Sequence, residues 1–255
     1  MAEVLAKKIE CMANWTRAML TPDFRIPLLN DSSIDLTPES TWVLQAVEEI
    51  DDVASPASFF ILLSELVDGK SPLSKEVCKA GSVSLAASGY YVMRGAEGSV
   101  MYLDCGRVCP DYLPPHAHAD TLAYELWIRG EPVITDSGVF EYTSGVWRDF
   151  FRGTGAHNTL VVDGYDQSEV WGSFRVARRA FPLDAHMICT EVADYFCGSH
   201  DGYTRLNDPV MHCRRVIYLK DHWWLIIDQC TGGGPHRLDN YIHLDPAVEF
   251  RASDG

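Results

Sequence analysis

Two histidines and two aspartates are the residues of this chain best placed to do chemistry together. The segment PPHAHADTLAYEL carries His116, His118 and Asp120 at alternate positions, and PVITD ends in Asp136. Alternate side chains of an extended strand point to the same face, so the first three would point together. Such a group could bind a metal ion, handle protons or be a row of surface histidines, and the spacing alone leaves all three interpretations open.

Zinc is the metal that these side chains suit best. Zinc binds neutral imidazole and carboxylate groups, and a zinc site that does chemistry usually has three protein ligands and a water. His118 could supply one ligand, and Asp136, expected on the neighbouring strand, a second. The segment GTGAHNTLVVDG offers His157, just before another predicted strand, as the third. Histidines that contact substrate without metal are the competing interpretation.

The elements that must position these residues change in character near residue 69. All nineteen glycines lie at or after Gly69. Before it, apolar residues recur at helical spacing from Leu5 to Met19, a second helix is predicted to open at Thr37-Pro38-Glu39, and 58–67 fits a third. We therefore expect a helical segment over residues 1–70.

After residue 70 the apolar residues alternate with period two, which predicts strands. The clearest predicted strands are Thr159–Val162, Ser173–Ala177, Arg215–Leu219 and Trp223–Asp228. The run RRVIYLKDHWWLIID predicts a hairpin with its turn at Lys220-Asp221-His222, and because both strands are apolar on two faces we expect it to be covered on both sides. The fold class predicted is mainly β, a large antiparallel β-sandwich over residues 71–255.

Composition and charge disfavour several classes of partner. The net charge of −15 argues against nucleic acid or an anionic membrane as the main partner. No apolar run approaches the ~18–20 residues that span a bilayer. The N-terminus lacks the apolar core of a secretory signal, which leaves the compartment open. The eight cysteines form no CxxC pair, so a zinc ribbon is not indicated. Whether the chain forms a homo-oligomer is undecided.

Four separated motifs resemble the C-terminal half of the heparinase II/III-like polysaccharide lyases, a family that includes oligo-alginate lyases. They are, in order, PPHAHADTLAYEL, PVITDSGVFEY, WRDFFRGTGAHNTLVVDG and DQSEVWGSFRVARRA, and the likeness extends over residues 80–245. Members of this family have an α/α-toroid followed by a multi-layered antiparallel β-sandwich. The resemblance implies that residues 1–70 are the end of a toroid and that the sandwich of residues 71–255 continues beyond the C-terminus.

The resemblance also implies roles for individual residues. The residues that match the family's zinc ligands are His118, Asp136 and His157. His116 matches a residue that binds or polarises the substrate at the cleavage point, and Tyr142 lies where oligo-alginate lyases place a catalytic tyrosine. The family's remaining key residues lie on toroid helices and have no match in residues 1–68, so the activity of this chain on its own is in question.

The implied reaction is β-elimination on a 4-linked uronate in an acidic polysaccharide. Neutralising the uronate carboxylate stabilises the enolate-like intermediate that forms when the C5 proton leaves. A tyrosine or histidine can take that proton, and a tyrosine can return one to the leaving oxygen. Arg148 and Arg152 lie close before His157, and their planar guanidinium groups suit carboxylates and sulfates, so we expect them to bind substrate on an otherwise acidic protein.

Two other functions stay open. An HxH followed by Glu125 and Gly130 on a β fold is similar to a cupin metal site, although the glutamate lies farther along than in cupins and WRDFFRGTGAHNT has no cupin counterpart. The second alternative is a non-catalytic carbohydrate-binding or assembly module that keeps the sandwich and its zinc. The sequence names neither the polysaccharide nor endo or exo action.

Overall fold

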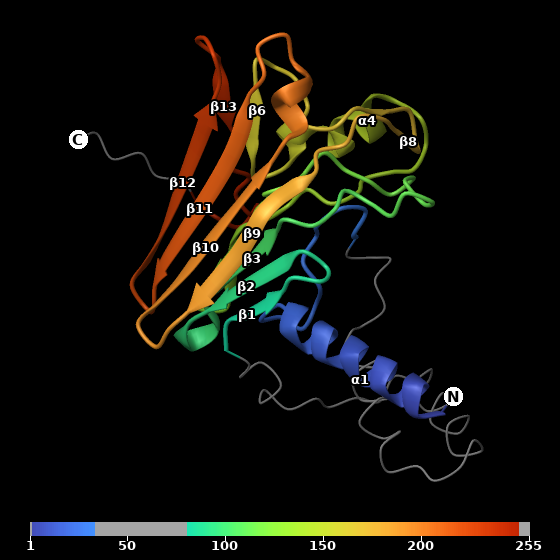
Figure 1. Cartoon of the computed structure of the whole chain (residues 1–255). Coiled ribbons are helices and arrows are strands. Elements are labelled where there is room, and N and C mark those ends of the chain that lie inside the picture. Colours follow the sequence, from blue (N-terminus) through green and yellow to red (C-terminus); the bar gives the residue numbers. More distant parts are fainter. Residues whose placement is uncertain (1, 34–80, 250–255) are drawn as a thin grey trace.

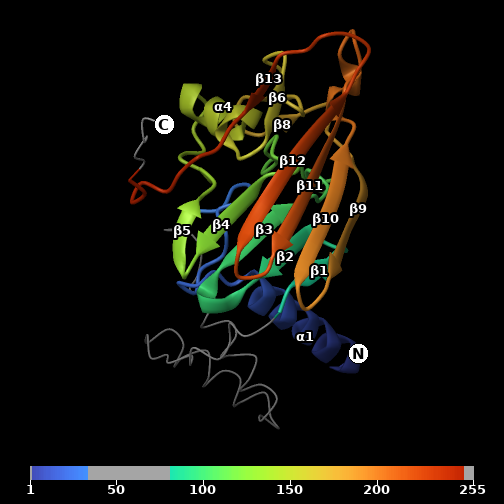
Figure 2. The ribbon, with the colours of Figure 1, turned by 90° about the vertical axis from the view of Figure 1, so that its left-hand side faces the viewer.

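The computed structural model describes residues 2–33 and 81–249, which are mostly antiparallel strands (Figures 1 and 2). The helices predicted to open at Thr37 and to cover 58–67, and the boundary near residue 70, lie outside the described residues. Helix α1 (Ala2–Met19) confirms the first predicted helix. In the described part of the chain, no helix is long and apolar enough to cross a membrane.

The first sheet has five antiparallel strands in chain order. They are β1 (Val83–Leu85), β2 (Tyr90–Arg94), β3 (Val100–Asp104), β4 (Tyr124–Ile128) and β5 (Glu131–Ile134). The long connection between β3 and β4 carries the HAH motif. It starts beside the β1–β2 turn, where Gly89 has a φ of +82° and an added Cβ would lie 2.1 Å from the Cα of Gly106. Only glycine fits such a close approach of two backbones.

The second sheet has four antiparallel strands in the order β12, β11, β10, β9. They are β9 (Pro182–Cys189), β10 (Ala193–His200), β11 (Met211–Leu219) and β12 (Trp223–Thr231). The predicted hairpin is confirmed, because Leu219 of β11 pairs with Trp223 of β12 across a turn in which Asp221 has a φ of +62°.

The two sheets pack face to face, which confirms the predicted sandwich (Figures 1 and 2). The apolar residues buried between them include Tyr91, Met93, Met101, Leu103, Phe196, Val216 and Tyr218. On the other face of the first sheet, Val92 and Tyr102 pack with Met19 of α1. The helix is therefore a third layer over the first sheet.

The outer face of the second sheet differs from its prediction. Trp224 and Ile226 of β12 pack against the core, whereas Trp223, Leu225 and Ile227 are 48%, 44% and 39% exposed. Among the described residues nothing buries these three side chains, so the expectation that the hairpin is covered on both sides was wrong there. Apolar residues on both faces of a strand show that the strand is hydrophobic. They do not show which face is covered by another layer of the fold.

Shorter elements other than the turn between β2 and β3 gather at one end of the sandwich (Figure 1). The short strands are β6 (Leu160–Val162), β7 (Val170–Trp171), β8 (Arg175–Val176) and β13 (Leu238–Asn240). The short helices are α4 (Val146–Arg152) and the 3-10 turns η2 (Ala96–Gly98), η3 (Thr154–Ala156) and η4 (Gly202–Arg205). The predicted strand at Thr159–Val162 is β6, and β8 lies within the one predicted at Ser173–Ala177. All but η2 lie around the chemistry-bearing residues.

Candidate functional site

A group of three buried side chains could hold a metal ion at this end of the sandwich. His118 and Asp120, from the β3–β4 connection, and His157, from the turn before β6, offer ligand atoms within 4.8 Å of one another. His118 Nδ1, Asp120 Oδ2 and His157 Nε2 are buried and have no hydrogen-bond partner among the described residues. A buried polar atom without a partner costs about 1–3 kcal/mol, and three that face each other call for a shared partner such as a cation.

Asp136, just after β5, contacts the opposite side of the His157 ring. Its two carboxylate oxygens lie 2.8 and 3.1 Å from His157 Nδ1. A carboxylate on one imidazole nitrogen commonly orients the other nitrogen towards a metal. The structure therefore brings together His118 and His157 and adds Asp120, which the sequence analysis did not include among the three expected zinc ligands. The ligand role of Asp136 stays a prediction.

Burial and charge act in opposite directions on these groups. Burial lowers the pKa of His157, but the Asp136 carboxylate acts in the opposite direction through its charge and its hydrogen bond, and the resulting pKa is about 9. Burial lowers the pKa of His118 in spite of its hydrogen bond to Asp31, and burial raises the pKa of Asp120. In the metal-free protein His118 is therefore neutral at pH 7, whereas His157 carries a proton that a metal ion would have to displace.

This arrangement predicts how the stability of the metal-free chain depends on pH. A histidine whose folded pKa is raised stabilises the folded state below its ordinary pKa and loses that contribution as the pH passes its folded pKa. We expect the free energy of unfolding to fall between pH 6.5 and about 9, by on the order of 3 kcal/mol. Urea unfolding of chelator-treated protein across this range measures the slope. The His157→Gln variant is the control and should lack this part of the slope; an equal slope in both proteins would contradict the prediction.

An aspartate that the sequence did not suggest completes the site. The carboxylate of Asp31 lies 2.7 Å from His116 Nδ1 and 2.6 Å from His118 Nε2. The two terminal nitrogens of Arg148 donate to its two oxygens at 2.5 and 2.9 Å. Burial raises the pKa of Asp31, but the hydrogen bonds from His118 and Arg148 outweigh it and hold the pKa well below its usual range. We call Arg148, His116 and His118 the carboxylate cradle.

Tyr142 borders this cradle. Its ring lies 6.0 Å from that of His116, 6.2 Å from Phe174 in a stacked pair, and 5.1 Å from the guanidinium carbon of Arg148. Tyr142 is 36% exposed, so a ligand can reach it. The structure thus brings together three of the residues predicted to meet substrate, namely His116, Tyr142 and Arg148.

Arg152 lies one turn along α4 from Arg148 and is fully buried. Its guanidinium nitrogens donate to the backbone carbonyls of Ala117, Gly172 and Arg175 at 3.0, 2.8 and 3.1 Å. Burial and the neighbouring Arg148 lower its pKa. This geometry fastens the HAH connection to the β7–β8 turn, and the predicted contact of Arg152 with substrate stays a prediction.

The glutamate that a cupin would use is engaged elsewhere. Glu125 on β4 accepts hydrogen bonds from the backbone amides of Leu28 at 2.6 Å and Asp136 at 3.3 Å, and burial raises its pKa to about 8. It does not belong to the metal-capable group of the described residues. The cupin arrangement is therefore not the one that these residues form.

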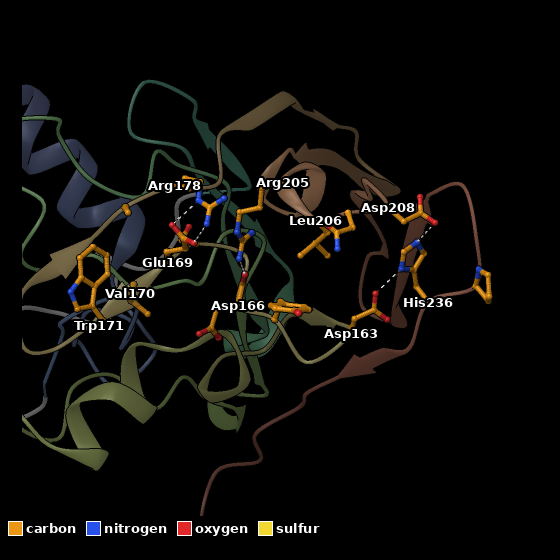
Figure 3. A pocket seen from close by; sticks show the side chains of 15 residues that line it. Asp163, Asp166, Glu169, Val170, Trp171, Arg178, Arg205, Leu206, Asp208 and His236 are labelled. Carbon is orange, nitrogen blue, oxygen red and sulfur yellow. Dashed lines mark hydrogen bonds and ion pairs between the residues drawn. The ribbon is translucent and has the colours of Figure 1, made fainter.

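A separate hollow of about 820 Å³ is lined in part by Val170 and Trp171 of β7 (Figure 3). It is lined by four carboxylates, Asp163, Asp166, Glu169 and Asp208, with only two arginines, Arg178 and Arg205. Arg178 pairs with Glu169, and His236 lies between Asp163 and Asp208 (Figure 3). The predicted site residues do not line this hollow, and its acidic wall would repel an anionic sugar.

Comparison with known proteins identifies the family to which the chain belongs. The family described as heparinase II/III-like, C-terminal, matches residues 79–255. The heparin-sulfate lyase of Pedobacter heparinus is 24% identical over 253 residues, an alignment that covers 92% of this chain and 33% of the relative.

Solved structures show the same fold. The heparan sulfate lyase HepC from Pedobacter heparinus superposes with a TM-score of 0.63 at 21% identity, over 89% of this chain and 33% of that chain. A heparinase III gives a TM-score of 0.66 at 19% identity, over 96% of this chain and 35% of that chain. The chain therefore spans about a third of the length of the relatives it matches.

Proposed function

Because the chain belongs to the heparinase II/III-like family through its C-terminal domain, we propose that it is the sandwich part of a lyase that cleaves a uronic-acid-containing polysaccharide by β-elimination. The relatives are named for heparin and heparan sulfate, so a sulfated uronate chain is the first substrate class to test. The chain covers a third of those relatives, and the proposed activity is that of the whole protein.

The observation that carries this proposal is the carboxylate held by the cradle. The Arg148 fork and the His116 imidazole bind the Asp31 carboxylate as they would bind a uronate carboxylate. A uronate would exchange with Asp31 at this position. Hydrogen bonds and positive charge on that group would make its C5 proton easier to remove, because they stabilise the enolate-like intermediate.

Tyr142 is the proposed proton donor to the leaving oxygen. Burial and the nearby Asp31 raise its pKa, so the hydroxyl keeps its proton at neutral pH until the bond to the leaving group breaks. His116 borders the same space and is the proposed partner that binds the carboxylate or takes the C5 proton. A general acid or base in such a position typically contributes 10²–10⁴-fold to the rate.

We further propose that His118 and His157 hold a zinc ion together with a carboxylate. Asp136 is the carboxylate that the family resemblance favours, and Asp120 is the one whose oxygen lies among the unpartnered atoms. Bound there, zinc would neutralise buried carboxylates and fasten the connection that carries His116 to the turn before β6. The proton transfers described above need only the side chains of the protein.

An ultraviolet assay of the natural full-length protein tests the proposed reaction. Each elimination creates an unsaturated uronate that absorbs in the ultraviolet, so absorbance should rise with heparan sulfate, alginate or another acidic polysaccharide. The same polymer with its carboxyl groups reduced to alcohols is the matched control and should give no rise. Binding of a polymer with no absorbance change across the panel would favour the non-catalytic carbohydrate-binding module instead.

A further inference from the structure

Arg214 lies outside the candidate site but contacts both backbone segments that carry it. It projects from β11 and is fully buried. One of its terminal nitrogens donates to the carbonyls of Leu122 and Asn158, each at 2.7 Å. Leu122 follows Asp120 by two residues, and Asn158 follows His157 directly. A single guanidinium nitrogen therefore joins the two segments whose side chains form the metal-capable group.

The Leu122 carbonyl belongs to a strained turn. Leu122 has a φ of +69°, a left-handed conformation that costs a residue with a Cβ about 1–2 kcal/mol. The turn is closed by a hydrogen bond from the amide of Ala123 to the carbonyl of Asp120 at 2.8 Å. The hydrogen bond from Arg214 stabilises this turn from outside, and the turn sets the direction of the Asp120 side chain.

A buried chain of hydrogen bonds holds the other side of Arg214. The Nε and the second terminal nitrogen of Arg214 donate to the two oxygens of Asp228 at 2.8 Å. Nε2 of His212 lies 2.8 Å from Asp228, and Nδ1 of His212 lies 3.1 Å from Nε2 of His200. Gly202 donates its amide hydrogen to Nδ1 of His200. Each imidazole therefore carries its proton on Nε2. His200 donates to His212, and His212 donates to Asp228, so the carboxylate that accepts from Arg214 is itself held in place.

We propose that Arg214, oriented by Asp228 and His212, is a positioning residue that fixes the distance between the Asp120 turn and His157. Its effect on metal affinity rests on the proposed zinc site, whereas its hold on the two segments does not. The planar guanidinium of Arg214 matters more for this role than its positive charge. A lysine at this position would keep the charge but could not donate to two carbonyls and to both oxygens of a carboxylate in one plane. Arg214 would thus shape the site without touching ligand.

The test compares Arg214→Lys with Arg215→Lys in the full chain. Arg215 is the next residue on the same strand, but it is only partly buried and donates to Gln229 at 2.8 Å, so its substitution is a matched control. We measure cobalt(II) affinity from the visible spectrum, and amide hydrogen exchange over residues 119–124 and 156–160. Arg214→Lys should weaken cobalt binding about 10–100-fold and speed exchange in both segments, and Arg215→Lys should do neither.

A third variant separates positioning from general loss of stability. Val216→Ala removes buried volume on the same face of β11 and should destabilise the fold without loosening the two segments selectively. Unchanged exchange over both segments in Arg214→Lys overturns the proposal, as does an equal response in Val216→Ala. If the wild-type chain binds no cobalt, the zinc site fails, and hydrogen exchange alone still decides the role of Arg214.

Discussion

Replacing Tyr142 by phenylalanine is expected to lower the turnover of the proposed reaction by the full-length protein about 10²–10⁴-fold and to change KM by no more than about twofold. The ring remains, so its stacking on Phe174 and its contact with Arg148 are kept. Only the hydroxyl is lost, and with it the proton for the leaving oxygen. The initial rate of ultraviolet absorbance against polysaccharide concentration gives both constants.

Tyr165→Phe is the matched control for this substitution. Tyr165 is 56% exposed and lines the acidic hollow, which no residue of the carboxylate cradle lines. The Tyr165→Phe variant should turn over substrate at the wild-type rate. If Tyr142→Phe also keeps wild-type turnover, Tyr142 is not the proton donor, and the acid must be sought on another part of the protein.

Replacing either His118 or His157 by alanine is expected to reduce the bound metal from about one ion per chain to nearly none. Each variant removes one of the two imidazoles in the group and leaves too few ligands for tight binding. The melting temperature should fall below that of metal-loaded wild type, because neither variant gains the free energy of metal binding. Elemental analysis after dialysis measures the metal, and calorimetry measures the melting temperature.

Two asparagine variants identify the carboxylate ligand. If Asp136 binds the ion, Asp136→Asn should lose metal as completely as the histidine variants. If Asp136 only orients His157, the affinity should fall about 10–100-fold, and Asp120→Asn should be the variant that loses the metal. Asp163→Asn, at the exposed edge of the acidic hollow, is the control and should keep its ion. Full metal content in both histidine variants would contradict the zinc site.

Much of the sandwich follows from patterns that are local in the sequence. The alternation in RRVIYLKDHWWLIID and the turn residues around Asp221 were sufficient to predict the β11–β12 hairpin and the place of its turn. The layers around the hairpin could not be predicted in this way. Whether Trp223 is covered depends on segments far away in the chain, and apolar alternation carries no information about them.

The candidate site was predictable where its residues share a motif. The HxH spacing, Asp136 and His157 each lie in short recognisable segments, but Asp31 is 85 positions from His116 and belongs to no pattern. Buried arginines pose the same difficulty. Arg214 and Arg215 are adjacent and identical in type, yet one is enclosed with two carbonyls and a carboxylate while the other pairs with Gln229 near the surface. Only tertiary packing separates them.

For the proposed binding of a uronate at the cradle, Asp31 is a competing carboxylate that belongs to the same chain. A carboxylate fixed in the same chain acts at an effective concentration far above that of free sugar in solution, commonly in the millimolar range for short tethers. A single uronate should therefore displace it poorly, whereas a long polymer that gains contacts elsewhere can do so. Selectivity for chain length would then arise from avidity, with one anion replacing another and little net change of charge.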